Sequence, residues 1–208
     1  GGGFARVDAA SQSARLEYWT KALRTLDAIP YDQLSADEKV NAQVFKASIQ
    51  ALANDVRFRA YEAPFNSDTF FWASFTPRQG MPNADAYRAF LTLLRDVPRH
   101  FEEQTVNMRA GLARGFSVPR GSVVGRDATI EPYTRVDATN PLFVPFTMMP
   151  ASIPAKDQEA LRAEASALIR DVVAPAYVKL LAFIRNEYLP KTRTTLAAVK
   201  MPDGEAYY

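Results

Sequence analysis

The sequence predicts an all-α protein, an antiparallel multi-helix array with one aromatic-rich loop. Three observations favour this fold class. First, apolar residues recur at spacings of three and four along several segments. Second, each of these segments begins and ends with residues that are typical of helix ends. Third, prolines are concentrated between the segments. With 208 residues, of which 48% are hydrophobic, the chain is long enough to bury a sizeable core.

The first helix is expected from about Ala9 to Ala28, and Pro30 ends it. Its apolar residues share one face, because they follow a helical period. They are Leu16, Trp19, Leu23 and Leu26.

The second helix has the clearest start, because Ser35 and Glu38 fit a capping box. It is expected to continue to about Ala60. Two neighbouring apolar stripes run along it, so we expect it to pack against more than one neighbour. The first stripe comprises Val40, Val44, Ala47 and Ala51, and the second Phe45, Ile49, Leu52 and Val56.

Residues 64–82 are irregular and rich in aromatic side chains. A loop this apolar is expected to fold onto the helices or to line a cleft. We interpret Trp19 and Trp72 as core residues.

A third and a fourth helix follow the aromatic loop. Asn83 is the predicted N-cap of the third, which Pro98 kinks or ends. The fourth is predicted to end at Gly115, where a left-handed cap belongs.

Residues 116–154 are rich in proline and give a weaker pattern. Pro119 is expected to open a short helix, and a strand over 142–148 stays an open alternative that the prolines disfavour. A long helix is expected from near Ser152, bent at Pro175 and ended by Pro190.

The last residues predict that the chain is a fragment of a longer protein. Pro202, Asp203 and Gly204 form a turn sequence, and 205–208 resemble the first turn of a new helix, which is not stable alone. We interpret 1–208 as a single N-terminal helical region. It divides into a tail or cloning scar (1–8), a helical group (9–115), an irregular segment (116–154), a long kinked helix (155–190) and the start of a truncated element (191–208).

Composition excludes several classes of function. The net charge is +2 without a run of like charges, so nucleic acid is not an expected partner. The apolar stretches are too short for a transmembrane segment. Without cysteine, the chain has no disulfide, thiolate nucleophile or Cys-ligated metal. No signal peptide is visible.

Several short motifs occur in an order that resembles a known family. They are 112–115 (Leu-Ala-Arg-Gly), 174–177 (Ala-Pro-Ala-Tyr), 187–190 (Glu-Tyr-Leu-Pro), 193–195 (Arg-Thr-Thr) and 202–208 (Pro-Asp-Gly-Glu-Ala-Tyr-Tyr), together with 26–30 and 34–41 near the start. This set is similar to the N-terminal part of the bacterial family of domain of unknown function 885. One departure is Leu196-Ala197-Ala198, where members usually carry a glycine.

The resemblance implies a large, mostly helical protein. Members are often predicted to be lipoproteins or secreted, and they are regarded as zinc metallopeptidase-like because of a His-Glu-x-x-His type helix in their C-terminal half. It therefore implies a missing C-terminal half of the same protein, which would hold the zinc, and a periplasmic or secreted location. A cytoplasmic location stays open.

No catalytic or metal-binding residue is predicted within this chain. A zinc peptidase site needs two histidines and a carboxylate, and His100 is the one histidine. We interpret it as a surface or helix-start residue, although His100 and Glu103 share a helix face.

Two places are candidates for contact with a peptide substrate. The first is Asn66 and Asp68, beside Ser67 and between aromatic residues. The alternative is a loop packed over the core in which Asp68 caps a turn.

The second candidate is Arg193 with Tyr207 and Tyr208. Arginine can hold a carboxylate in bidentate fashion, and tyrosine can stabilise an oxyanion. Alternatively, Arg193 caps the preceding helix and the tyrosines are core residues of the next.

The hypothesis that follows is an N-terminal helical portion of a zinc-dependent peptidase-like hydrolase, which contributes a wall of the substrate cleft and is inactive alone. The alternative is a non-enzymatic helical binding or scaffolding module. A large exposed apolar face would favour the first, because a piece of a bigger fold exposes its interface.

Overall fold

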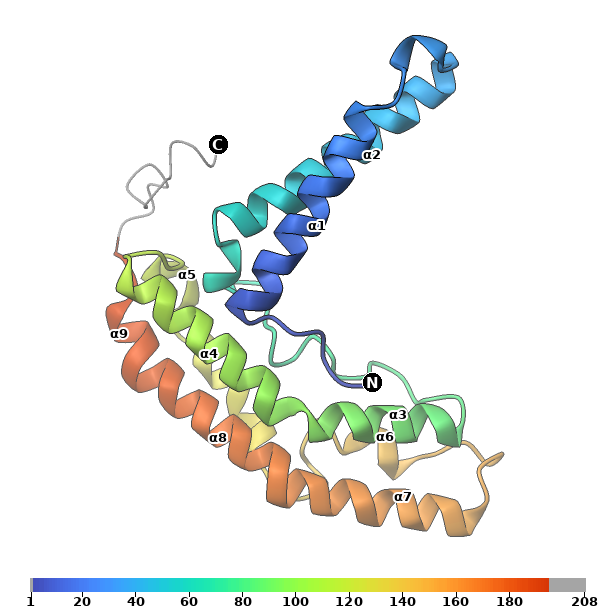
Figure 1. The fold of residues 1–208 in the computed structure, drawn as a ribbon. Coiled ribbons are helices and arrows are strands. Elements are labelled where there is room, and N and C mark those ends of the chain that lie inside the picture. The colour runs from blue at the N-terminus through green and yellow to red at the C-terminus, as the bar shows by residue number, and fades with distance from the viewer. Residues whose placement is uncertain (1, 195–208) are drawn as a thin grey trace.

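A computed structural model describes residues 2–194, and it confirms the all-α fold class (Figure 1). Two helical layers form its main part: α3 and α4 pack against α7 and α8, and η3 packs against α8 as well. The α-helices are α1 (Ala9–Asp27), α2 (Ala36–Arg57), α3 (Ala84–Arg95), α4 (Val97–Ala113), α5 (Arg120–Val123), α6 (Val144–Thr147), α7 (Ala155–Leu168), α8 (Ala174–Phe183) and α9 (Leu189–Lys191). Three 3₁₀ segments are η1 (Tyr31–Gln33), η2 (Ala60–Glu62) and η3 (Arg126–Thr134), and two π-helical segments are η4 (Ile169–Val173) and η5 (Ile184–Tyr188).

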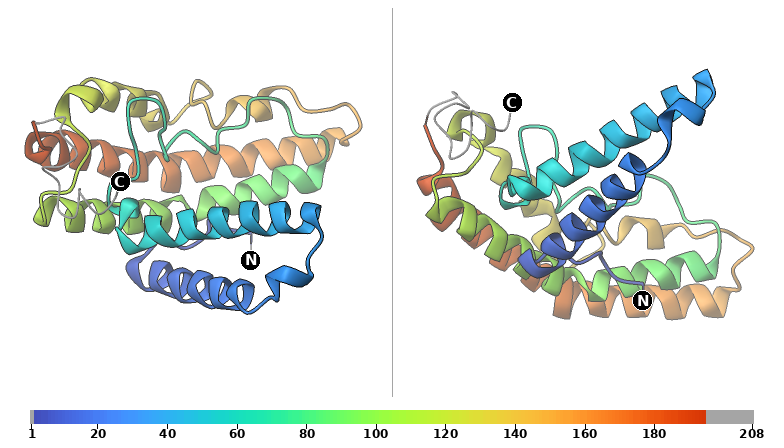
Figure 2. Two further views of the ribbon diagram at one scale, coloured as in Figure 1. Left: turned by 90° about the horizontal axis from the view of Figure 1, so that it is seen from above. Right: turned by 45° about the horizontal axis from the view of Figure 1, so that its top comes forward.

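Helices α1 and α2 form an antiparallel hairpin that projects from the layered part (Figures 1 and 2). We call this hairpin the arm. The predicted capping box at its second helix is confirmed, because the Glu38 N–H donates to Ser35 Oγ at 3.2 Å and the Ser35 N–H donates to Glu38 Oε2 at 2.8 Å. Segment η2, which follows α2, packs against α4 and so connects the arm to the layers.

The predicted caps of α3 and α4 are also confirmed. Asn83 accepts a hydrogen bond from the Ala86 N–H at 2.9 Å. Gly115 has a φ of +75°, and the Phe116 N–H bonds to the Gly111 carbonyl at 2.8 Å, which makes a Schellman motif. Pro98 lies in the first turn of α4, where the missing N–H costs nothing, so α3 ends before it.

The long C-terminal helix contains a repeated sequence. Ile-Arg-Asp-Val-Val-Ala-Pro begins at Ile169, and Ile-Arg-Asn-Glu-Tyr-Leu-Pro begins at Ile184. The first five residues of each copy are π-helical, and the proline follows at the start of the next α-helical segment. Since the wider π turn accommodates a proline that cannot donate, the helix continues past both prolines.

Aromatic residues from the loop before α3 fill the centre of the molecule. Phe65 is 2% exposed and Trp72 is fully buried. The Tyr177 hydroxyl donates to the Trp72 carbonyl at 2.5 Å, and Trp72 Nε1 donates to Thr129 Oγ1 at 3.0 Å. The expectation that this loop folds onto the helices is therefore confirmed.

Several details differ from the sequence predictions. Helix α2 ends at Arg57, because Arg59 takes a left-handed conformation (φ 57°). This end could not be predicted, because the residue that usually adopts such a conformation is glycine. Residues 144–147 form the short helix α6, and no strand occurs within 2–194. The long helix begins at Ala155, the first residue of the predicted range 155–190, but it passes Pro190 and ends at Lys191.

Candidate functional site

The predicted contact residues Asn66 and Asp68 lie in a tight turn. Asn66 Oδ1 accepts the N–H groups of Asp68 and Thr69, both at 2.8 Å, and Ser67 Oγ donates to Asp68 Oδ2 at 3.1 Å. Asn66 and Asp68 are exposed, whereas Phe65 is anchored in the core. The turn thus presents the Asp68 carboxylate to solvent, and a substrate contact there stays a prediction.

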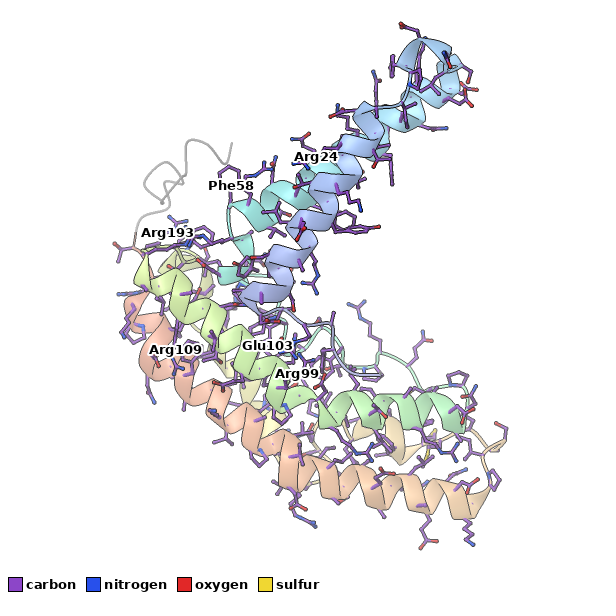
Figure 3. The ribbon with its side chains drawn as sticks, in the orientation of Figure 1. Arg24, Phe58, Arg99, Glu103, Arg109 and Arg193 are labelled. Carbon is purple, nitrogen blue, oxygen red and sulfur yellow. The ribbon has the colours of Figure 1, made fainter. Side chains whose placement is uncertain are left out.

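Arg193 lies just beyond α9 and joins this end of the helix to the segment after α4 (Figure 3). Its Nε donates to the Ser117 carbonyl at 2.7 Å, and its N–H to Ser117 Oγ at 3.0 Å. Arg120 rather than Arg193 donates to the Pro190 carbonyl, at 2.5 Å. The other two members of this candidate set, Tyr207 and Tyr208, lie outside the described residues.

His100 is buried in the first turn of α4, so its interpretation as a surface residue is wrong and its helix-start position is right. Its ring stacks on Phe4, with centroids 4.2 Å apart. Burial lowers the pKa of its imidazole, and its Nδ1 has no hydrogen-bond partner within 2–194. This ring is enclosed by aromatic groups and is not presented as a metal ligand.

Glu103, like His100, has a structural role. Its carboxylate accepts the Val7 N–H at 2.9 Å and pairs with Arg6 and Arg99, each at 2.9 Å (Figure 3). Burial raises the Glu103 pKa, but this hydrogen bond and the two guanidinium groups outweigh burial and leave the pKa below its ordinary value. His100 and Glu103 therefore do not form a zinc site, and residues 2–194 contain no cluster of three or more potential ligands.

A groove in the layered part lies between α4 and the helix α8–η5. Its volume is about 320 Å³. The floor is apolar, with Phe101, Leu180 and Phe183 each buried, and Asn186 stands exposed on the π-helical segment at one end. A groove of this size and composition suits an apolar side chain of a peptide.

Two ion pairs span the groove. Arg109 makes a bidentate pair with Glu187, at 2.8 and 3.0 Å, and Lys179 pairs with Glu102 at 2.9 Å. The hydrogen bonds between the first two partners raise the Arg109 pKa and lower that of Glu187. Because each of these four charges already has an opposite partner, the groove offers a ligand its apolar floor rather than an unpaired charge.

Sequence reasoning missed this groove, because its residues come from helices far apart in the chain. One available signal was the repeated Ile-Arg-Asp/Asn sequence, since a proline inside a periodic helix predicts a local adjustment. The second copy places Asn186 and Glu187 at the groove, and π-helical segments are frequent at functional sites.

Comparisons with known proteins agree with the resemblance noted from the sequence. A family model described as "Bacterial protein of unknown function (DUF885)" matches residues 2–208. A search of curated proteins finds no match. The crystal structure of a protein described as a putative lipoprotein, from Colwellia psychrerythraea, has the same fold, with a TM-score of 0.72 and 14% sequence identity.

This chain is much shorter than the Colwellia protein. The match covers 100% of this chain but 38% of the Colwellia chain. This chain therefore corresponds to well under half the length of that protein. None of the helices within 2–194 combines the length and apolar character required to cross a bilayer.

Proposed function

This chain belongs to the bacterial protein family of unknown function DUF885, and we propose that it forms one wall of the substrate cleft of a zinc-dependent peptidase-like hydrolase. The observation that carries the structural part is that the whole chain matches 38% of a longer chain with the same fold. The peptidase-like part rests on the family resemblance. The putative lipoprotein description of the Colwellia protein supports a location outside the cytoplasm.

In this proposal, the zinc and the activated water belong to the rest of the polypeptide. His100 and Glu103 do not fit zinc, because the first is stacked against Phe4 and the second is occupied by arginines and a backbone N–H. The groove between α4 and α8–η5 contributes binding through its apolar floor and polar rim. The turn at Asn66 and Asp68 stays a second candidate contact.

The exposed apolar surface of the arm supports the placement of this chain within a larger fold. Val40 and Val44 on α2 are 57% and 63% exposed. A piece of a larger fold exposes the surface that the rest covers, and a binding module exposes such a surface to its partner, so the experiment below separates the two.

The first test compares the 208-residue chain with the complete polypeptide that its gene encodes, using a quenched-fluorescence peptide library. The complete polypeptide is expected to cleave peptides, to lose this activity with a chelator and to regain it with zinc. The 208-residue chain is expected to be inactive. A complete polypeptide that binds no metal and cleaves nothing would overturn the proposal in favour of the binding module.

The groove has a matched pair of variants. Asn186→Trp fills the exposed end of the groove, and Asp171→Trp places the same ring at the equivalent position of the first π-helical segment, which lies outside the groove. We expect Asn186→Trp to raise KM about fivefold or more with kcat little changed, because the indole ring blocks binding that the substrate and the transition state share. Equal KM values for the two variants would show that the groove is not part of the substrate cleft.

A further inference from the structure

The outward face of α2, defined by Val40, Val44, Ala47 and Ala51, is apolar but exposed, although its sequence pattern predicts a packed face. All four residues are exposed. Ala53, which is fully buried, lies nine residues and so two and a half helical turns from Val44, on the opposite side of the helix. Helix α1 packs against α2, and the outward face is left uncovered within the described residues.

Charge distinguishes this helix from its partner in the arm. Helix α1 carries five charged residues, Arg15, Glu17, Lys21, Arg24 and Asp27, as a solvated helix does. Between Val40 and Asn54, α2 carries Lys46 as its one charged residue, and Lys46 pairs with Asp27 of α1. The outward face of α2 is therefore an uncharged surface more than three turns long, which is typical of a buried interface.

The spacing of the four residues indicates what covers them. They are separated by four, three and four positions, the pattern of a seam between two helices that cross at a shallow angle. Alanine at two of the four positions permits close approach of a second helix. The seam is about 16 Å long, from eleven steps of about 1.5 Å each.

We infer that the outward face of α2 docks an amphipathic helix from the part of the complete polypeptide that lies outside these 208 residues. The occupant is assigned to the same polypeptide because a protein of the same fold has a chain of which this one covers 38%. In that arrangement α2 is sandwiched, with α1 on one side and the docked helix on the other. This also explains why α2 carries apolar residues on the side that faces away from α1.

Covering this face would fix the arm in place. Helices α1 and α2 contact each other extensively. The arm is attached to the layers at one end only, by residues 4–7 before α1, which bond to Asp96, Glu103 and Asn107, and by η2 after α2, which packs against α4. In η2, Glu62, which is 3% exposed, pairs with Arg114 at 2.5 Å. An arm held at one end gains a second attachment when its outward face is docked.

Thiol labelling tests this inference directly, because the 208 residues contain no cysteine. Val44→Cys and Ala47→Cys each place a small thiol on the outward face of α2, and Lys21→Cys places one on the exposed side of α1 as a control. Each variant is made in the complete polypeptide and in the 208-residue chain. The rate of reaction with a maleimide is measured, with the unsubstituted protein as background.

In the complete polypeptide, we expect the thiols at 44 and 47 to react at least about tenfold more slowly than the thiol at 21, because docking buries them. In the 208-residue chain, all three rates should agree within about twofold. Equal rates in the complete polypeptide would overturn the inference. So would protection in the 208-residue chain that grows with concentration, because the occupant would then be a second copy.

The inference rests on the proposed function in that both place this chain within a longer polypeptide. The two fail differently, however. Labelling requires no catalysis, so slow labelling at position 44 in a polypeptide without peptidase activity would support the docking surface and overturn the hydrolase. Peptide cleavage together with fast labelling would do the reverse.

Discussion

Gly111 lies where η2, at the end of the arm, packs against α4, and replacing it by alanine should loosen that contact. A Cβ added at Gly111 would lie 2.7 Å from the Phe116 carbonyl oxygen, 2.9 Å from the Glu62 carbonyl oxygen and 3.0 Å from Glu62 Cβ. Two of these three neighbours are backbone atoms, which cannot rotate away. Either the end of α4 or segment η2 must therefore move.

The expected change in the free energy of unfolding follows from two opposing effects. Overpacking of a tight site costs about 1–3 kcal/mol, and the backbone contacts at Gly111 place it near the upper end of that range. Alanine gains about 1 kcal/mol over glycine within a helix. The net expectation for Gly111→Ala is a loss of about 2 kcal/mol in the free energy of unfolding, which corresponds to a urea midpoint lower by about 1 M.

The assay is urea unfolding followed by circular dichroism, with Gly121→Ala as the matched control. Gly121 also lies in a helix, but an added Cβ meets nothing within 4 Å. Its replacement should not lower the free energy of unfolding and should raise it by up to about 1 kcal/mol, the gain of alanine over glycine in a helix. If Gly111→Ala were as stable as the unsubstituted chain, with the same dependence on urea, the close approach of η2 to α4 would be refuted.

Two further predictions concern buried polar groups. Tyr177→Phe should lower the free energy of unfolding by about 1–2 kcal/mol, because it leaves the buried Trp72 carbonyl without the hydroxyl donor; thermal or urea unfolding should show no such loss for Tyr18→Phe, whose ring is exposed. Burial holds the pKa of His100 below its ordinary value near 6.5, so the unfolded chain binds a proton more readily, and stability should fall as pH drops below about 6.5. Unfolding at pH 7.5 and 5.5 should show a smaller fall for His100→Phe, which retains packing against Phe4; equal falls would mean that the histidine is not buried in its neutral form.

Local features of the fold could be predicted from the sequence because neighbouring residues determine them. The capping box of Ser35, the cap at Asn83 and the left-handed Gly115 are each fixed by side chains within a few positions. The end of α2 could not be predicted in this way. Arg59 adopts a left-handed conformation that its own sequence disfavours, so tertiary contacts around η2 decide it.

The candidate site was less accessible to sequence reasoning than the fold. The groove combines residues of α4 with residues of α8 and η5, and the partners Arg109 and Glu187 are 78 positions apart. A single sequence contains no signal for such a pairing. The motif that did attract attention, Glu187 to Pro190, lies in part at the groove, but Arg193 is occupied in joining the end of α9 to Ser117.

The stripe of α2 that contains Val40 and Val44 shows how a sequence pattern can be informative where the described contacts leave it unexplained. The pattern predicts packing on more than one side, and α1 supplies one side. Ile49, on the side toward α1, is 3% exposed, whereas Val44 is 63% exposed. Burying a valine is worth about 1.5 kcal/mol or more, so a helix that leaves two of them in water retains a substantial driving force for association. Because that driving force is concentrated on an uncharged seam, the outward face of the arm is better understood as one side of a helix–helix interface than as a surface that stays in solvent.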